Sequence, residues 1–264
     1  MRQLTYEKHT TRFLMHHALT HSHTSSRTGK ITVALATSKD QIRAAQALRY
    51  RIFADEMGAK LNTKEFGIDE DLFDAYCDHL IAMNDETGEV VGTYRILPPH
   101  QAKKVGSYYS DIEFDLTRLQ HIRPQLVEFG RSCVDANYRT GSTIARLWAG
   151  LSQYMRQNNY QYMMGCASIP LSDGGHRATS LYNQLKAASY APIEWRVFPR
   201  HPLPLAGLAG QIEVEIPPLI KGYIKAGAMV CGEPAWDPDF NSADFFMLLP
   251  MNALNARHVR HFSR

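Results

Sequence analysis

The spacing of hydrophobic and polar positions changes along the chain, and it first predicts a strand, a helix and a hairpin. Residues 31–35 are mostly apolar, as in a short strand, and Ser38 or Asp40 then caps a helix that extends to Phe53. The apolar runs 79–83 and 90–97 flank a turn-prone Asn-Asp-Glu-Thr-Gly segment, which is typical of an antiparallel pair of strands.

The rest of the chain continues with strands and helices in alternation. Residues 126–134 alternate between apolar and polar, as in a half-buried strand, and residues 142–158 repeat apolar positions at intervals of three and four, as in an amphipathic helix. We expect further strands at 162–168, 195–198, 229–230 and 243–249, and further helices at 179–188 and 219–226. This order predicts an α/β (α+β) fold with a mixed sheet that has helices on both faces.

Three segments are predicted along the 264 residues. Residues 1–28 form a mobile tail with five histidines, residues 29–250 form one globular domain, and residues 251–264 form an exposed basic tail. A histidine-rich run can bind a metal ion. No second type of ligand recurs at metal spacing in that run, so no metal site is predicted.

The composition narrows the classes of function. With 29 Lys and Arg against 26 Asp and Glu, the formal net charge of +3 is too small for a dedicated nucleic-acid binder, whereas an acidic protein partner or an anionic membrane surface stays open. The four cysteines form no CxxC pair, which favours a reducing cytoplasm over a disulfide framework. No run approaches the roughly 20 apolar residues of a membrane span, so we expect a protein that is at most peripheral to a membrane.

Charged residues within the apolar elements are the candidate functional groups. A charge on a half-buried strand is costly unless it is paired, so such residues indicate either a structural ion-pair network or an active-site cluster. Glu128 and Arg131 are three apart and therefore face opposite sides of a regular strand, unless a β-bulge lies between them. The candidates are Arg49, Asp71, Asp74, Arg95, Glu128 and Arg131.

Four segments occur in an order and spacing that resemble a known superfamily: LRYRIF (48–53), DLFD (71–74), GTYRILPP (92–99) and VEFGRS (127–132). They resemble the acyl-homoserine-lactone synthases and N-acyl amino acid synthases. Further segments, among them YYSDIEFDL (108–116), KGYIKAGAMV (221–230) and DPDFNSADFF (237–246), resemble the bacterial ornithine-lipid N-acyltransferase branch over residues 31–250. Ala59 stands where the lactone synthases carry a tryptophan, which disfavours lactone synthesis.

The resemblance implies a GNAT-like fold and an acyl-transfer reaction. A fatty or 3-hydroxyfatty acyl group would move from the thioester of acyl carrier protein to the α-amine of an amino acid, usually ornithine, to give a lyso-ornithine lipid. The phosphopantetheine thioester would be the donor substrate, with no further cofactor. Two alternatives stay open: another acceptor such as glycine or tyrosine, and a non-catalytic protein that binds a lipid or a partner.

The resemblance also carries roles to individual residues. Glu128, with Arg95 and Arg131 beside it, is the candidate general base, acting directly or through one water. Alternatively, it only orients the substrate ammonium or pairs with those two arginines. An amino-acid carboxylate suits a bidentate arginine, and a second ammonium suits an aspartate. The candidate substrate-binding residues are Arg49, Phe53, Asp71 and Asp74; without the resemblance, the two aspartates would equally suit a solvated turn with a helix cap.

The carrier is expected to meet the start of the helix at 142–158. Backbone N–H groups and the helix dipole could hold the phosphate of a phosphopantetheine arm there. The candidate residues are Arg139, Gly141, Ser142 and Thr143, although a plain helix start would look similar. A basic surface for an acidic carrier protein could be formed by Lys103, Lys104, Arg118, Arg123, Arg139 and Arg146.

Overall fold

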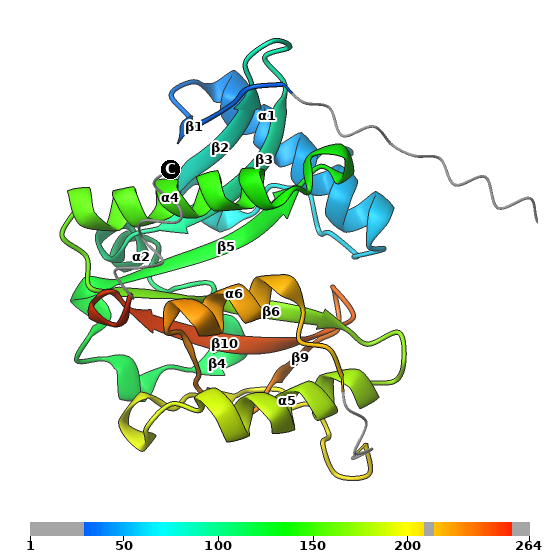
Figure 1. Ribbon diagram of the computed structural model, residues 1–264, viewed down its shortest axis with the longest axis vertical. Helices are drawn as coiled ribbons and strands as arrows, with labels where there is room; N and C mark the ends of the chain where they lie inside the picture. Colours follow the sequence, from blue (N-terminus) through cyan, green and yellow to red (C-terminus); the bar gives the residue numbers. More distant parts are fainter. Residues whose placement is uncertain (1–28, 209–213, 255–264) are drawn as a thin grey trace, which may run out of the picture.

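The computed structural model describes residues 29–208 and 214–254 (Figure 1). The predicted histidine-containing tail 1–28 and most of the predicted basic tail 251–264 therefore lie outside the described residues. Within the described ranges, no helix is long and apolar enough to cross a membrane.

An eight-stranded mixed sheet forms the centre of the fold. Its strands follow the order β1-β2-β3-β5-β6-β10-β8, and β9 pairs with β10 beside β8. Only β5 and β6 pair in parallel among the described strands, and a separate small sheet joins β4 to β7. The strands are β1 Ile31–Leu35, β2 Asp78–Asn84, β3 Val90–Leu97, β4 Phe114–Asp115, β5 Leu126–Val134, β6 Tyr162–Pro170, β7 Phe198–Pro199, β8 Met229–Val230, β9 Ala235–Asp237 and β10 Ser242–Pro250.

Helices cover both faces of this sheet, as the sequence predicted. α4 packs on β1, β2 and β3 and α5 on β8, and α6 joins the same hydrophobic cluster as α5 (Figure 1). α1 packs on the opposite face of β2, β3 and β5. The helices are α1 Lys39–Tyr50, α2 Pro99–Val105, α3 Ser110–Glu113, α4 Gly141–Gln157, α5 His176–Ser189 and α6 Pro218–Ala226, with a π-helix η1 Arg51–Glu56 and 3-10 turns η2 Leu72–Tyr76, η3 Thr117–Leu119, η4 Arg123–Gln125, η5 Ala136–Tyr138, η6 Ile193–Trp195 and η7 Met251–Ala253.

Most of the predicted elements are present, and one is wrong. Ser38 caps α1, accepting a hydrogen bond from the Gln41 amide, and α1 continues into the π-helix that carries Phe53. The strand expected at 195–198 does not exist: residues 193–195 form the turn η6, and only Phe198–Pro199 pairs, with β4. Proline at 192 and 199 restricts that stretch, because proline supplies no amide donor to a sheet.

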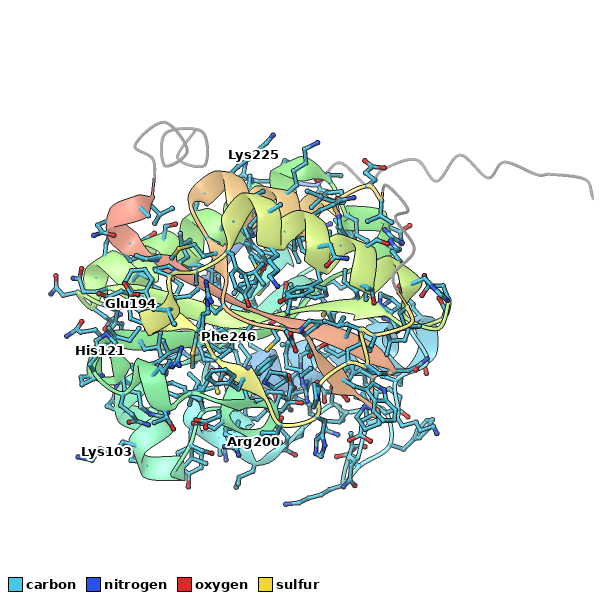
Figure 2. The ribbon with its side chains drawn as sticks, turned by 90° about the horizontal axis from the view of Figure 1, so that it is seen from below. Lys103, His121, Glu194, Arg200, Lys225 and Phe246 are labelled. Carbon is cyan, nitrogen blue, oxygen red and sulfur yellow. The ribbon has the colours of Figure 1, made fainter. Side chains whose placement is uncertain are left out.

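Apolar side chains fill the space between the sheet and its helices. Phe246 on β10 is buried inside this core, whereas Lys103 on α2 and Lys225 on α6 extend to the periphery of the molecule (Figure 2). β10 is buried along its whole length, in keeping with a central strand covered on both faces.

The parallel strands β5 and β6 stay paired over only three residues. Leu126, Val127 and Glu128 face Tyr162, Met163 and Met164, and beyond these pairs the two strands diverge. Gly165 lies just past the last pair, where a Cβ atom would come within 2.2 Å of the Phe129 carbonyl oxygen. A glycine is therefore required at the point where the strands separate.

Gly165→Ala should destabilise the protein by about 1–3 kcal/mol, the usual cost of forcing extra volume into a packed site. The obstacle is backbone, which cannot swing away as a side chain can. Gly130→Ala, on the neighbouring strand, is the matched control because a Cβ there would meet nothing within 4 Å. Urea denaturation of both variants measures the difference; equal midpoints would contradict the close approach.

Candidate active site

Arginines and aspartates from four elements form a buried chain of ion pairs on the α1 face of the sheet. Arg49 of α1 is fully buried, and its Nε lies 2.7 Å from Asp69 while Nη2 lies 2.8 Å from Asp74. Arg95 of β3 continues the chain, 2.9 Å from Asp74 and 2.6 Å from Asp71. The sequence prediction of an ion-pair network or a cluster is therefore realised, with Asp69 as an additional member.

Mutual pairing sets the protonation of this chain. Burial alone would raise the pKa of Asp74, but the Arg49 and Arg95 guanidiniums outweigh burial and hold that pKa well below its ordinary value. Burial alone would lower the pKa of Arg95, whereas Asp71 and Asp74 raise it. Asp74 and Arg95 are consequently charged at neutral pH. Both predicted substrate aspartates are engaged by arginines, and Asp71 also caps η2 in a capping box with Asp74.

A β-bulge in β5 brings Arg131 to this face. The pairing of β3 with β5 shifts by one residue between Thr93 and Arg95, and Arg131 has φ of +49°, in the left-handed region. Its guanidinium lies between the Tyr109 and Phe240 rings, with its carbon 5.0 Å from each ring centre, and only 3.4 Å contacts join it to Asp69 and Asp71. A bulge is therefore present in this strand, but it lies after Gly130, between the residues that pair with Arg95 and with Thr93.

Glu128 does not pair with either arginine. Its carboxylate accepts hydrogen bonds from the Tyr109 amide at 2.7 Å, from the Ser110 amide at 2.8 Å and from the Ser110 hydroxyl. Complete burial raises the pKa of Glu128, and these hydrogen bonds and Arg95 oppose the rise. The Ser110 hydroxyl also lies 3.7 Å from the Cys166 sulfur on β6, so it bridges Glu128 to the diverging strands.

A second group of acidic residues lies next to Cys166. Glu113, Cys166 and Asp244 offer ligand atoms within 4.8 Å of one another, and no Lys, Arg or His nitrogen among the described residues lies within 4.0 Å of either carboxyl group. Burial, and then the charge of Asp244, raises the pKa of Glu113, so this carboxyl keeps its proton. Burial also raises the pKa of the Cys166 thiol.

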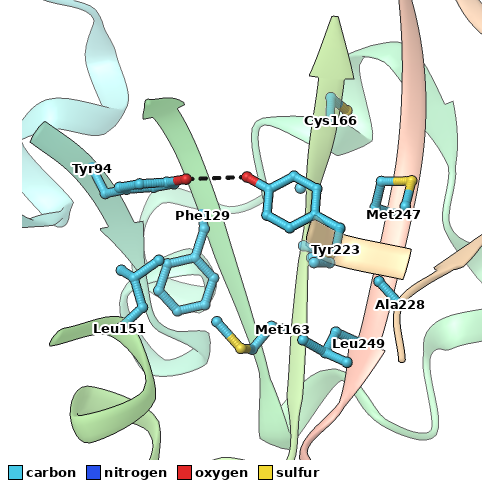
Figure 3. Close-up of a pocket in the computed structure, with 11 residues that line it drawn as sticks. Tyr94, Phe129, Leu151, Met163, Cys166, Tyr223, Ala228, Met247 and Leu249 are labelled. Atoms are coloured by element: carbon cyan, nitrogen blue, oxygen red, sulfur yellow. Dashed lines mark hydrogen bonds between the residues drawn. The ribbon is translucent and has the colours of Figure 1, made fainter. Parts of the chain in front are cut away.

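An apolar cavity of about 60 Å³ occupies the gap between β5 and β6 (Figure 3). Phe129 and Leu151 form one side, Met163, Met247 and Leu249 the other, and Cys166 lies at one end. Tyr94 of β3 and Tyr223 of α6 meet across the cavity with their hydroxyl oxygens 3.1 Å apart. The cavity thus lies beside the hydrogen-bond chain from Cys166 to Glu128.

The remaining predicted residues have defined but different surroundings. Phe53 is a core residue that packs edge-to-face on Phe240, with ring centres 5.7 Å apart, and so supports the ring beneath Arg131. Arg139 donates to the Val134 carbonyl and pairs with Glu56. Gly141, Ser142 and Thr143 do begin α4, where the Thr140 hydroxyl caps the Thr143 amide.

Sequence reasoning missed several groups that the structure brings together. Asp69 lies in an acidic loop and was not among the predicted site residues. Tyr109 and Ser110 lie in the segment 108–116 but had no predicted functional role. Glu113 and Asp244 gave no signal, because they are 131 positions apart and become neighbours only when β10 pairs with β6. A serine at the first position of a short acidic helix was the local clue to Ser110.

Comparison with known proteins places this arrangement in a family. Residues 48–149 match the model of an acetyltransferase (GNAT) domain. An L-ornithine N(alpha)-acyltransferase of Brucella abortus is 35% identical over 89% of this chain and 90% of its own length, and one of Agrobacterium fabrum is 33% identical over 89% and 86%. The chain belongs to the L-ornithine N(alpha)-acyltransferase family. It is therefore an enzyme, an N-acyltransferase, as the resemblance implied.

Solved structures confirm the fold of this acyltransferase. The CoA-dependent acyl-homoserine lactone synthase BjaI superposes with a TM-score of 0.52 at 15% identity, covering 89% of this chain and 87% of its own. The acyl-homoserine lactone synthase LasI gives a TM-score of 0.50 at 13% identity, covering 86% and 95%. At these identities the likeness shows the GNAT-like fold alone, and it confirms that prediction.

Asp74→Asn should destabilise the acyltransferase by about 3–5 kcal/mol, because Arg49 and Arg95 would lose a buried counter-charge. The difference in the free energy of unfolding between variant and wild type should become smaller as the pH falls below about 3.9. The depressed pKa of Asp74 stabilises the wild type above that pH, and this stabilisation is lost progressively below it. Asp85→Asn, in an exposed pair with Lys30, is the control and should cost less than about 1 kcal/mol. Chemical denaturation at pH 7 and pH 3 measures both effects.

Glu113→Gln should be more stable than the wild type at pH 8, by about 1 kcal/mol or more. The folded state holds a proton on Glu113 that the unfolded chain releases above about pH 4.3, so wild-type stability falls as the pH rises from there towards the raised folded pKa. The variant has no proton to lose at this position, so its free energy of unfolding should vary less between pH 5 and pH 8. Exposed Glu194→Gln should leave the curve unchanged, and parallel curves for Glu113→Gln and wild type would contradict a protonated Glu113.

Proposed function

We propose that this acyltransferase moves a fatty or 3-hydroxyfatty acyl group from an acyl-carrier-protein thioester to the α-amine of ornithine, giving a lyso-ornithine lipid. The observation that carries the proposal is the juxtaposition of an apolar cavity with a buried hydrogen-bonded carboxylate, Glu128, in a chain 35% identical to an L-ornithine N(alpha)-acyltransferase.

The cavity suits the first part of an acyl chain. Its walls are apolar, and a volume of about 60 Å³ exceeds the roughly 10–15 Å³ that holds one water, so the cavity has room for a few chain atoms. Met163, Met164 and Met247 line it, and unbranched thioethers rearrange at low cost. A longer chain is therefore admitted by movement of these methionines.

Amide formation needs a neutral amine that attacks the thioester carbonyl. A C–N bond forms, the C–S bond breaks, the thiolate leaves with the carrier, and the amine gives up a proton. The Ser110 hydroxyl is placed to accept that proton while donating its own to Glu128, because it links Glu128 to Cys166 at the end of the cavity. Burial raises the pKa of Glu128, in the direction that a base working near neutral pH requires.

An amino acid with a second ammonium group suits the charged residues around the Cys166 end of the cavity. Arg131 has only long contacts to aspartates and can turn its guanidinium to the acceptor carboxylate. Asp71 and Asp74 already face arginines, so the side-chain ammonium is better matched by Glu113 and Asp244, where it would replace the proton that Glu113 now holds. Arg49 and Arg95 then act by holding the aspartates in place.

Acyl carrier protein is proposed as donor on the strength of the resemblance. Of the basic residues that the sequence offered for its docking, Arg123 binds Asp111 and Arg139 binds Glu56, whereas Lys103 and Lys104 at the end of α2 are exposed. The amides at Gly141 and Ser142 stay candidates for the phosphate of the phosphopantetheine arm. A cytoplasmic location with peripheral membrane contact stays a prediction.

The test is an assay with purified protein, acyl carrier proteins loaded with chains of several lengths, and a panel of ornithine, lysine, glycine and tyrosine. Mass spectrometry should detect Nα-acylornithine in excess over the other products. Glu128→Gln should lower the rate at least ~10-fold, the low end for a general base, and should alter the acidic limb of the pH–rate profile.

Three outcomes would contradict the proposal at different points. Preference for glycine or tyrosine would overturn ornithine as the acceptor, and the absence of product with every pair would overturn acyl carrier protein as the donor. A wild-type rate in Glu128→Gln would overturn only the role of that carboxylate. Lys103→Glu is the companion variant for the donor and should raise KM for the carrier without changing kcat.

A further inference from the structure

The helices on one face of the sheet carry basic residues and no acidic ones. α4, α5 and α6 lie together on the near face of the sheet in Figure 1, and between them they hold six lysines and arginines but no aspartate or glutamate. The whole chain has 26 acidic residues, so their absence from all three helices distinguishes this face. We call it the basic face; its six charged residues, all exposed, are Arg146 and Arg156 on α4, Arg177 and Lys186 on α5, and Lys221 and Lys225 on α6.

The charges of the basic face are not neutralised within the chain. Among the described residues, none of the six lies within 4.0 Å of a carboxylate oxygen. The bordering loops add Asp173, whose carboxylate accepts hydrogen bonds from two backbone amides, and Glu215 before α6. On the opposite face, α1 and η1 carry four basic and three acidic residues, so the excess of positive charge there is small. The basic face therefore suits an anionic partner.

α6 combines this charge with exposed apolar side chains. Leu219 is 36% exposed, and Ile216 and Ile224 are half-buried beside Lys221 and Lys225. Lysines with apolar side chains between them are typical of a helix that lies at the boundary between lipid headgroups and acyl chains.

The inner side of α6 forms part of the cavity wall. The Tyr223 ring lines the cavity and stacks on Trp148 of α4, with ring centres 4.9 Å apart, and its hydroxyl oxygen lies 3.1 Å from that of Tyr94 (Figure 3). Lys221 and Lys225 on the same helix are exposed. One helix therefore separates the cavity from the solvent at the basic face.

We propose that the basic face binds the surface of a membrane that contains anionic phospholipids, with α6 at the headgroup boundary. The choice of a membrane rests on the proposed function, because a lyso-lipid product has a long apolar chain that must leave the cavity for a bilayer. With α6 at the bilayer surface, that chain passes from the cavity into lipid around a single helix, with little exposure to water.

An acidic carrier protein fits the basic face less well than a membrane does. The charges are spread over three helices, and exposed Leu219 lies among those of α6. Lys103, the candidate for docking of the carrier, lies at the opposite edge of the molecule from Lys225 (Figure 2). The carrier and the membrane can therefore bind at the same time.

The experiment is co-sedimentation of the full chain with vesicles of two compositions: phosphatidylcholine alone, and phosphatidylcholine with phosphatidylglycerol in equal amounts. No substrate is present, so binding is measured apart from catalysis. We expect the wild type to bind the anionic vesicles at least ~10-fold more tightly, since each lysine or arginine near an anionic surface strengthens binding ~5-fold. Added salt should weaken this binding.

The variant that tests the surface combines Lys221→Glu with Lys225→Glu, and it should bind the anionic vesicles at least ~10-fold more weakly than the wild type. Neither lysine lines the cavity, so the rate of acyl transfer without vesicles should stay at the wild-type value, which also shows that the variant is folded. The matched control combines Lys60→Glu with Lys64→Glu, two exposed residues in the loop after η1. It changes the net charge by the same amount and should keep wild-type binding.

Three results would overturn the inference. Equal binding to the two kinds of vesicle, or none to either, would exclude recognition of anionic lipid, and equal losses in the α6 variant and the control would exclude this particular surface. Unchanged vesicle binding in the α6 variant together with a raised KM for acyl carrier protein would make the basic face a carrier surface instead. Absence of N-acylornithine with every donor, while vesicle binding follows the expected pattern, would overturn the proposed function and not the membrane surface.

Discussion

The alternation of arginine and aspartate from Arg49 to Arg131 is the constraint on which the site depends. Its charges are buried or, at Asp71 and Arg131, half-buried, and each is tolerated because an opposite charge lies beside it. These ion pairs connect α1, the loop before η2, β3 and β5 to one another. Removing any interior member would leave its neighbours unpaired in a medium of low dielectric, so the four segments hold one arrangement.

One irregularity in β5 serves both faces of the sheet. The extra residue at the bulge turns Arg131 towards the aspartates and the Tyr109 ring. On the neighbouring strand, Tyr94 and Arg95 are adjacent and therefore point to opposite faces, one to the cavity and one to the ion pairs. The cavity and the ion pairs are thus linked through two consecutive residues of β3 and a single break in register.

The sequence was informative where the signal is local. Periodicity located β1, β5, α4 and β10 almost to the residue, and charges in apolar runs identified Arg49, Arg95 and Arg131 as special. It could not assign all of their partners, because Asp69 and Tyr109 lie in connections whose course depends on tertiary packing. Glu128 is the plainest case, because its partners are two backbone amides and a serine hydroxyl. Backbone amides are present at every residue except proline, so the sequence does not show which of them bind Glu128.

The brief pairing of β5 with β6 has a thermodynamic consequence for substrate entry. Past Glu128 and Met164 the two strands share no ladder, so an incoming chain breaks no backbone hydrogen bond between them. Space for a chain is therefore made by side-chain movement, chiefly of the methionines. Their rotamers interchange far more readily than strands separate. Under the proposed function, the sheet therefore stays rigid while the width of the cavity varies from one donor to the next.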